Sequence, residues 1–404
     1  MSKSIENNCD FLDEQLAKVL PLKSAGISLS LDKLPLKTPA FNAKELALQL
    51  GVTEAIFKTG LNKFEEQNGF KFPRKGNNAL DVNRSDAIEI MRFFEKKSIS
   101  DLRDDDFEVP VLLIHDAKGG IGKSTVAETL ATQSSFDLKN RPRTLLIDTD
   151  PQGSLRHKLA PKYTKPLHNL LRLLTTNVEL SRDIRLSPEK QAEYKAILAE
   201  IIVTTHADDV SLLPSFGDCK HLNVYLAGAL ARGISKDQVI SVYNDVIIEP
   251  LRSDFDLIII DSNPATDMML YTLYYAGTML VIPVTGRQQD VNAYVEYLES
   301  VKVILSTMMP SDAKGFNDII TLITKNTKKP KSIYNRSLKI KTLARCFSTM
   351  IFESKVYEDA SENNLPIQLM NHTSRNVRDS LEHASSLYEE IASLVFSQLQ
   401  CEEE

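Results

Sequence analysis

The 404-residue sequence has no long apolar run. A helix that spans a membrane needs about 20 consecutive, mostly apolar residues, and no segment of the sequence approaches that length. The first twenty residues, MSKSIENNCDFLDEQLAKVL, carry acids where a secretory signal would be apolar. These two absences predict a cytoplasmic protein with no membrane attachment.

Cysteine is also scarce, and its spacing is uninformative. The four cysteines (Cys9, Cys219, Cys346 and Cys401) lie far apart and form no C-x-x-C pair. That excludes a disulfide framework, and a zinc or iron–sulfur site contributed by one chain. The net charge of -6 argues against nucleic-acid binding by the chain as a whole. The distribution of basic residues therefore matters more than their sum.

What the sequence does contain is a series of short apolar runs. Each run is rich in β-branched residues and mostly apolar on both faces, which is typical of strands buried in a parallel sheet. Helical patterns lie between the runs, so the sequence predicts an α/β fold with a doubly wound, mostly parallel sheet. The runs are VPVLLIH (109–115), RTLLID (143–148), FDLIIID (255–261), MLVIPV (279–284) and DIITLIT (318–324).

The chain divides into three regions of different pattern. Residues 1–40 read as one helix and a connector, a possible dimerisation element. Residues 41–107 form a helix-rich segment that ends in the acidic linker DLRDDDFE. Residues 108–404 hold the α/β pattern, interrupted at 155–220 by a mostly helical elaboration to which no function is assigned.

The first run leads into HDAKGGIGKST, residues 115–125, which reads as strand, glycine-rich loop and helix. It almost fits the phosphate-binding pattern G-x-x-x-x-G-K-[ST], but Ala117 stands at the first glycine position. Glycines let backbone N–H groups close on phosphate oxygens, and the helix N-terminus favours the same anion. A glycine-rich turn without a ligand is the alternative. The predicted nucleotide-binding residues are Lys118, Gly119, Gly120, Ile121, Gly122, Lys123, Ser124 and Thr125.

Single residues of this loop have expected roles. Lys123 should reach the β- and γ-phosphates, and the Ser124 hydroxyl should coordinate Mg²⁺. Three carboxylates follow at the ends of later runs. Asp148 and Asp150 stand two apart, so an extended backbone points both to the same side, and Asp261 ends the third run. One acid at a strand end is usually a turn residue, but three beside a phosphate loop predict a metal site.

The loop KGGIGKS resembles that of the deviant Walker A ATPases, the family of ParA, MinD and the nitrogenase iron protein. The resemblance implies ATP and Mg²⁺ as cofactors, and an early lysine, Lys118, that reaches the phosphates of the partner subunit in a dimer. It also implies that Lys118, Lys123 and Asp150 are catalytic. Ser124, Asp148 and Asp261 would then serve the metal, with Asp261 as the Walker B acid.

Within that family the sequence is similar to the ParA branch. LLIDTDPQGS matches its D-x-D-P-Q-G run, and IFESKVYEDASENNLPI (351–367) resembles a late ParA segment. Phe352, Glu353 and Asp359 depart from that segment, so no adenine contacts are carried over. The iron-protein branch requires cluster cysteines that are not present. The MinD branch ends in a basic membrane helix, whereas this sequence ends in the acidic SSLYEEIASLVFSQLQCEEE.

Larger ParA proteins carry a helix-turn-helix ahead of the ATPase, and residues 41–70 fit one. Ala47 is small where two helices would cross, and Gly51 suits the turn between them. The next stretch, GFKFPRKGNNALDV, reads as a basic hairpin, which predicts a winged helix-turn-helix. An ordinary helical hairpin is the alternative. The predicted DNA-binding residues here are Thr53, Lys58 and Lys63.

A second basic zone lies late in the chain. No acid occurs from Ile319 to Phe352, while eight lysines and arginines do. Charge runs are usually solvated faces, but in an acidic chain this one predicts contact with a DNA backbone. NRSLKIKTLAR could present its basic residues along one helical stretch. The predicted contacts are Arg336, Lys339, Lys341 and Arg345.

Together these features imply a DNA-partitioning ATPase. By resemblance, ATP drives a homodimer that coats DNA on the nucleoid without sequence preference, either as separate dimers or as filaments. A ParB-like centromere-binding partner then stimulates slow hydrolysis, and the N-terminal module binds an operator and represses the operon. Two alternatives stay open: an ATP-sensing transcriptional repressor, and a MinD-like, membrane-associated spatial regulator.

Overall fold

The computed structural model describes residues 40–400, apart from 77, 105–106, 161–167, 216, 266 and 371–373. The predicted helix and connector of residues 1–40 therefore lie outside the described residues, except for Ala40. No helix in the described ranges is both long and apolar enough to cross a membrane.

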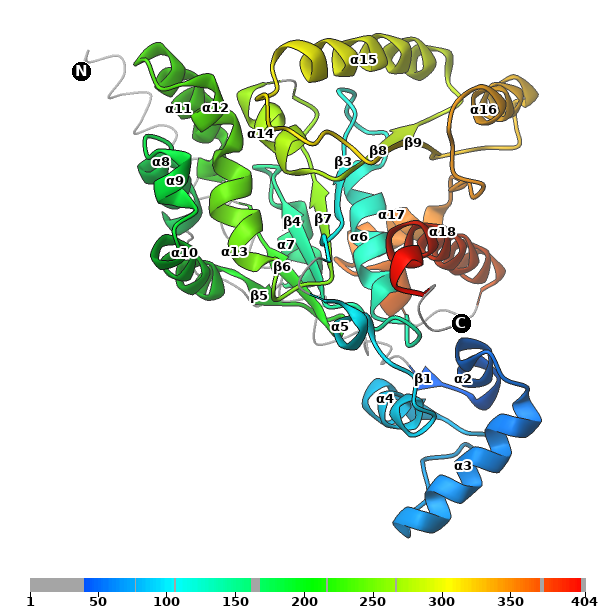
Figure 1. Cartoon of the computed structure of the whole chain (residues 1–404). Helices are drawn as coiled ribbons and strands as arrows, with labels where there is room; N and C mark the ends of the chain where they lie inside the picture. Colours follow the sequence, from blue (N-terminus) through cyan, green and yellow to red (C-terminus); the bar gives the residue numbers. More distant parts are fainter. Residues whose placement is uncertain are drawn as a thin grey trace, which may run out of the picture.

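A seven-stranded sheet forms the centre of the larger part of the molecule (Figure 1). Its order is β5-β6-β4-β7-β3-β8-β9, and every neighbouring pair is parallel except β5 with β6. All five predicted runs are strands of this sheet, so the predicted α/β class is confirmed. The strands are β3 (Val111–Ile114), β4 (Thr144–Asp148), β5 (Val203–Thr204), β6 (Val210–Leu213), β7 (Leu257–Asp261), β8 (Met279–Val284) and β9 (Asp318–Ile323).

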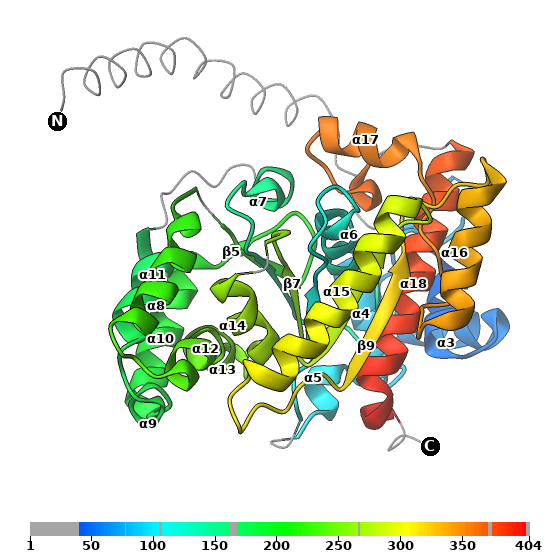
Figure 2. The same ribbon diagram turned by 90° about the horizontal axis from the view of Figure 1, so that it is seen from above.

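Helices cover both faces of the sheet because the central strands are apolar on both sides. On β3, Leu112 and Ile114 face a cluster shared with α6 (Lys123–Ser134) and α18 (Arg375–Gln400). Val111 and Leu113 face the opposite cluster. Figure 2 shows these two layers on either side of the strands. The helices of the second layer include α12 (Lys236–Tyr243), α14 (Met268–Ala276) and α15 (Gln288–Thr307).

The segment predicted as a helical elaboration is mostly helical and continues past residue 220, with β5 and β6 inserted in it. Arg185 and Asp245 are both fully buried and form an ion pair of 3.1 Å inside it. Their remaining polar atoms are partly satisfied by Ser241 and the Gln238 carbonyl, as a buried pair requires. Its helices are α7 (Ser154–Leu159), α8 (His168–Asn177), α9 (Arg182–Arg185), α10 (Pro188–Ile201), η1 (Gly217–Cys219), α11 (Lys220–Ala231), the π-helix η2 (Asn244–Ile248) and α13 (Glu249–Leu251).

The described N-terminal part is a small unit with its own apolar core. Asn42 caps the first helix with its side chain, and Glu45 completes the capping box. Gly51 ends that helix with φ 70°, a left-handed conformation in which glycine carries no Cβ strain. Thr53 caps the next helix two residues later. The elements are β1 (Ala40–Phe41), α2 (Ala43–Leu50), α3 (Glu54–Asn68), β2 (Val82–Asn83), α4 (Arg84–Phe93) and α5 (Ile99–Leu102).

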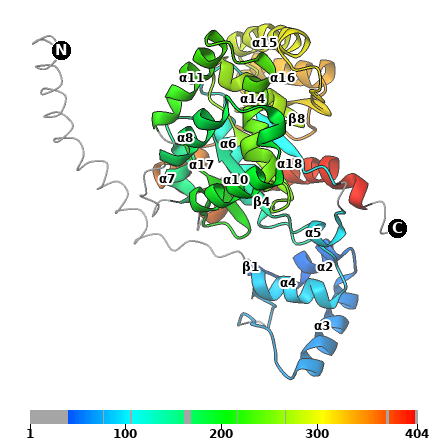
Figure 3. The ribbon, with the colours of Figure 1, turned by 60° about the vertical axis from the view of Figure 1, so that its left-hand side comes forward.

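This N-terminal unit is fixed to the rest of the protein by the loop that follows α6. Leu138 of the loop is fully buried in the N-terminal core. The Gln49 side-chain carbonyl accepts the N–H groups of Leu138 (2.6 Å) and Lys139 (3.0 Å). Arg84, itself 4% exposed, pairs with Asp209 at 2.6 Å. Figure 3 shows the unit attached at the end of the sheet where α5 lies.

After β9 the chain forms the outer helices of the molecule. Leu387, Ile391 and Phe396 of α18 pack into the same core cluster as the α6 face of the sheet. The remaining elements are α16 (Lys331–Leu343), α17 (Lys355–Glu362) and the short 3₁₀-helix η3 (Ile367–Leu369).

Candidate nucleotide site

The glycine-rich loop joins the carboxyl end of β3 to the N-terminus of α6. Gly120 (φ 75°) and Gly122 (φ 100°) adopt left-handed conformations that residues with a Cβ rarely take. Thr324, just past β9, donates its hydroxyl to the Ile121 carbonyl at 2.7 Å and fixes the loop from the side. The loop thus has the shape of an anion cradle, with the α6 N-terminus opening into it.

Lys123 begins α6 and is 7% exposed. Its ammonium group spans the loop and donates to the carbonyls of Asp116 (3.0 Å) and Lys118 (2.8 Å). Burial lowers its pKa, and the carboxylates of Asp116, Asp261 and Asp150 oppose that shift. A cation held in this way is available for the phosphate oxygens that the loop would enclose.

Lys118 is the earlier of the two lysines of the loop, and its side chain turns toward α15. The ammonium group pairs with Asp290 in the first turn of that helix. The backbone N–H of Lys118 donates to Asp116 Oδ1 at 2.7 Å. Lys118 is therefore held by both its backbone and its side chain within the same subunit.

Two predicted metal acids lie side by side in the sheet. Asp148 ends β4, Asp261 ends β7, and the parallel register pairs them directly. Both are buried, and Asp261 Oδ1, Asp261 Oδ2 and Asp148 Oδ2 have no hydrogen-bond partner among the described residues. Burial raises the pKa of Asp261 to about 7, and the nearby Ser124 hydroxyl opposes this shift. Burial also raises the pKa of Asp148, and the neighbouring Asp261 carboxylate adds to that shift.

Unpartnered buried carboxylate oxygens beside a phosphate loop fit Mg²⁺. Mg²⁺ prefers oxygen ligands, and it commonly takes one or two protein groups while substrate phosphates and water complete its shell. Ser124, on the first turn of α6, and the acids Asp148 and Asp261 can serve it here. Among the described residues, no group of three or more His, Cys, Asp or Glu side chains could hold a metal unaided.

Asp150, the third predicted acid, lies just beyond β4. Its backbone N–H donates to Asp148 Oδ1 at 3.0 Å, and its own Oδ1 accepts the Gln152 N–H at 2.9 Å. Thr149 between them is tied to the Asp261 carbonyl through both its N–H (3.0 Å) and its hydroxyl (2.9 Å). These bonds place the loops after β4 and β7 in one fixed arrangement next to the phosphate loop.

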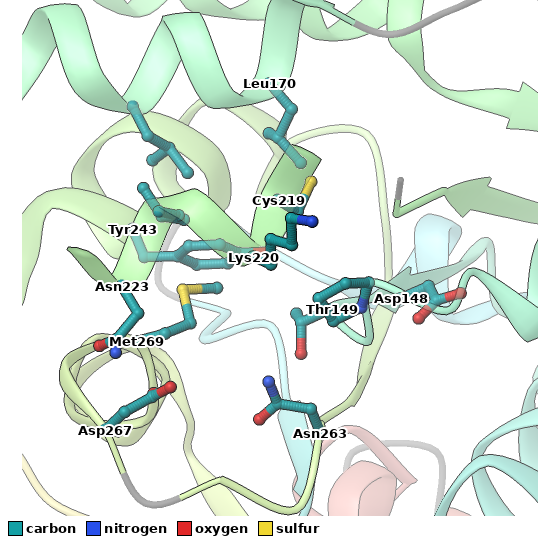
Figure 4. A pocket seen from close by; sticks show the side chains of 13 residues that line it. Asp148, Thr149, Leu170, Cys219, Lys220, Asn223, Tyr243, Asn263, Asp267 and Met269 are labelled. Carbon is teal, nitrogen blue, oxygen red and sulfur yellow. The ribbon is translucent and has the colours of Figure 1, made fainter. Parts of the chain in front are cut away.

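A cleft of about 40 Å³ joins these loops to the helical elaboration (Figure 4). Thr149 and Asn263 point toward one another across it, Cys219 lines it from the elaboration, and Tyr243 lines it from the end of α12. Asn223 Oδ1 accepts the N–H of Met268 at 2.8 Å, which connects α11 to the start of α14. No feature of the sequence predicted this connection, because its residues come from distant segments.

Sequence reasoning missed several residues that support the loop. The His115 ring bonds the Tyr297 hydroxyl at 2.7 Å, and Tyr297 in turn bonds Tyr274 at 2.7 Å. Burial lowers the pKa of His115 to about 3, so the ring is neutral. Asp290 was also missed; its one signal is an acid in the first turn of the helix that follows MLVIPV.

The N-terminal DNA candidates lie on or next to α3. Thr53 is the N-cap, and its hydroxyl accepts the Ile56 N–H at 3.3 Å. Lys58 is exposed and pairs with Glu54 one turn earlier at 2.7 Å. Lys63 is exposed one turn further along. The structure thus places Thr53 at the start of α3 and the two lysines on its exposed surface, and the spacing of five residues turns each about 140° from the one before it. Their role in DNA binding stays a prediction.

The late basic candidates are less uniform than the sequence suggested. Arg336 donates its Nε–H to the Gly286 carbonyl at 2.8 Å, and Lys341 donates to the Ser348 carbonyl. Arg345 forms a two-bond pair with Asp318. Lys339 is exposed on α16. The expectation of one helical stretch is wrong for Arg345, because α16 ends at Leu343 and the chain turns to run beside β9.

Comparison with known proteins identifies the family to which the chain belongs. The AAA domain family (AAA_31) matches residues 109–311, half of the chain. The chain belongs to this family, as a ParA-type ATPase. It is 23% identical over 246 residues to plasmid partition protein A of Escherichia coli, and the match covers 59% of this chain and 59% of that protein.

Solved structures show the same fold. A partition protein aligns with a TM-score of 0.66 at 16% identity, covering 98% of this chain and 99% of that one. Cobyrinic acid a,c-diamide synthase from Mycobacterium smegmatis, with a bound ATP analogue and magnesium, aligns with a TM-score of 0.50 at 18% identity, covering 71% and 97%. The nucleotide and magnesium belong to that neighbour, and at these identities the likeness shows the fold of this chain alone.

Proposed function

We propose that this ParA-type ATPase partitions DNA. In this proposal ATP and Mg²⁺ join two subunits into a dimer that binds DNA non-specifically, as dimers or filaments on the nucleoid. A ParB-like, centromere-binding protein then stimulates hydrolysis and releases the dimer. The observation that carries the proposal is the loop with two separately held lysines beside the Asp148–Asp261 pair.

Each residue of the site has a role in this proposal. Lys123, fixed across the loop, binds the β- and γ-phosphates once they replace its two carbonyl acceptors. Ser124, Asp148 and Asp261 hold Mg²⁺, which when bound neutralises charge on the phosphates. Asp150 orients the attacking water. The bond from its backbone N–H to Asp148 Oδ1 fixes its position next to the metal acids. Lys118 adds positive charge to the partner's γ-phosphate as hydrolysis proceeds.

The N-terminal unit is proposed to be a winged helix-turn-helix that binds the operator. Two capped helices with a three-residue turn between them support this, as does the bridge between Arg74 and Leu80 that closes the following hairpin. We place the domain boundary after residue 107, as the sequence suggested. Leu138 crosses that boundary into the N-terminal core, so an isolated 41–107 fragment would lack part of its core.

DNA binding by wild type and Lys118→Ala, each with ATP, ADP or no nucleotide, tests the proposal. Fluorescence anisotropy with a random-sequence duplex is suitable, since operator binding then does not contribute. We expect tight binding only for wild type with ATP. DNA binding that depends on neither nucleotide nor Lys118 would refute the dimer mechanism. It would favour a transcriptional repressor for which ATP is at most a ligand.

A further inference from the structure

Lys118 has a partner within its own subunit. Its ammonium group pairs with Asp290 Oδ1, while the other carboxylate oxygen, Oδ2, accepts the Thr285 hydroxyl. Both oxygens of Asp290 are therefore occupied. The Lys118 side chain is 33% exposed and that of Asp290 is 9% exposed, so this is a partly desolvated pair and not a loose surface contact.

Asp290 is well fixed for this contact. It lies in the first turn of α15, where the positive end of the helix dipole stabilises a carboxylate. Its backbone N–H donates to the Arg287 carbonyl at 3.0 Å, and Thr285 precedes the helix on the chain leaving β8. The carboxylate thus belongs to a rigid element, whereas the lysine stands on the glycine-rich loop.

We infer that Asp290 is a positioning residue that holds the early lysine, Lys118, in its own subunit until an ATP-loaded partner competes for it. This inference rests on the proposed function, in which Lys118 acts across the dimer. In this inference the Lys118 ammonium group moves away from Asp290 when it reaches a phosphate in the other subunit. The γ-phosphate of ATP offers more negative charge than a carboxylate, and ADP lacks that group.

The consequence is a threshold for dimerisation. Breaking the Lys118–Asp290 pair is part of the cost of forming the dimer, so each subunit dimerises less readily than one whose lysine is free. Thr285 contributes indirectly by fixing Asp290. Removing the pair should lower the ATP concentration at half-maximal dimerisation by about five- to tenfold, the scale expected of a partly buried ion pair.

The test uses sedimentation velocity of the full chain over a range of ATP concentrations with Mg²⁺. Asp290→Asn keeps the shape of the side chain and removes its charge, and it should dimerise at lower ATP than wild type. Thr285→Val, which loses the hydroxyl donor, should shift the curve in the same direction by less. Glu353→Gln is the matched control, since Glu353 pairs with Arg287 beside α15 but does not contact Lys118.

The double variant Lys118→Ala/Asp290→Asn isolates the contact. If Asp290 acts through Lys118, the double variant should behave as Lys118→Ala alone. An Asp290→Asn curve that matches wild type, or a shift equal to that of Glu353→Gln, would overturn the inference while leaving the proposed function intact. If Lys118→Ala itself dimerised normally with ATP, the proposed function would fail first. Thermal melting of each variant distinguishes these outcomes from misfolding.

Discussion

Lysines and arginines gather at two places in this protein, and their surroundings in the structure differ. In the phosphate loop, Lys123 and Lys118 are each held by specific acceptors of the same subunit. In the segment after β9, Lys325, Lys328 and Lys339 are exposed. The two loop lysines have positions fixed by their acceptors at the carboxyl ends of the strands. The exposed lysines after β9 instead spread positive charge over the surface.

The difference separates two kinds of function. A buried, directed cation can contribute to chemistry, because its position is fixed and its charge is poorly screened. An exposed cation contributes to the field that attracts a polyanion, and no single one is essential. The four predictions below test this contrast, beginning with the variant for which we expect the largest effect.

Lys123→Ala should reduce the affinity for ATP about 100-fold or more, because a buried cation directed at the phosphates is lost. Isothermal titration calorimetry with ATP and Mg²⁺ measures this directly. Lys339→Ala is the matched control, a lysine of the exposed group, and its ATP affinity should equal that of wild type. Nearly normal ATP binding by Lys123→Ala would remove the distinction between the two groups.

Asp150→Asn should slow hydrolysis about 100-fold while leaving ATP affinity within a few-fold of wild type. Asparagine keeps the shape and the acceptor for the Gln152 N–H but cannot orient water as a carboxylate does. A single-turnover assay with radiolabelled ATP separates the chemical step from binding. A parallel loss of both binding and turnover would instead give Asp150 a structural role.

The same contrast explains how far the sequence could predict the molecule. The five buried strands were predictable because their apolar runs are continuous, and the loop at 118–125 because its pattern is local. Asp148 and Asp261 were predictable as partners, since parallel strands bring their carboxyl ends to one edge. Local patterns within regular helices and strands can therefore be predicted from a single sequence.

Contacts between distant segments were not predictable. Asp290 lies 172 positions from Lys118, and Asp318 stands just outside the acid-free stretch, yet it neutralises Arg345. Leu138 gave no sign that it would complete the core of the N-terminal unit. In each case tertiary packing brings the two residues together, and the pattern of charge or hydropathy along the sequence does not indicate which residues will meet.

Asp261→Asn should change how stability depends on pH in the nucleotide-free, Mg²⁺-free protein. Burial raises the pKa of Asp261 from its ordinary 3.8 to about 7, so the folded state binds more protons than the unfolded state between these values. The free energy of unfolding should then fall as pH rises from about 4 to 7, by up to about 1.4 kcal/mol per pH unit from this group. Asparagine removes this contribution.

Urea denaturation of wild type and Asp261→Asn at pH 5 and pH 7.5 measures the difference. We expect the variant to lose less stability than wild type between these two pH values, by about 1–3 kcal/mol. Asp261 also raises the pKa of the neighbouring Asp148, so the substitution removes that effect too and the comparison measures the Asp148–Asp261 pair. Equal losses would show that Asp261 is ionised throughout the range, and that the site is more polar than its burial implies.

The smallest effect should come from single cations of the basic segment. Lys339→Ala should weaken non-specific DNA binding only a few-fold and lower the slope of log K against log salt by about 0.9, the value for one phosphate contact. Arg345→Ala should lower the slope less, because Asp318 already occupies its guanidinium group. Asp318→Asn frees that arginine and should steepen the slope. If Arg345→Ala reduced the slope as much as Lys339→Ala, the Arg345–Asp318 pair would be opening when DNA binds. The number of phosphate contacts would then depend on the number of surface cations alone, and not on the contacts that each cation makes in the free protein.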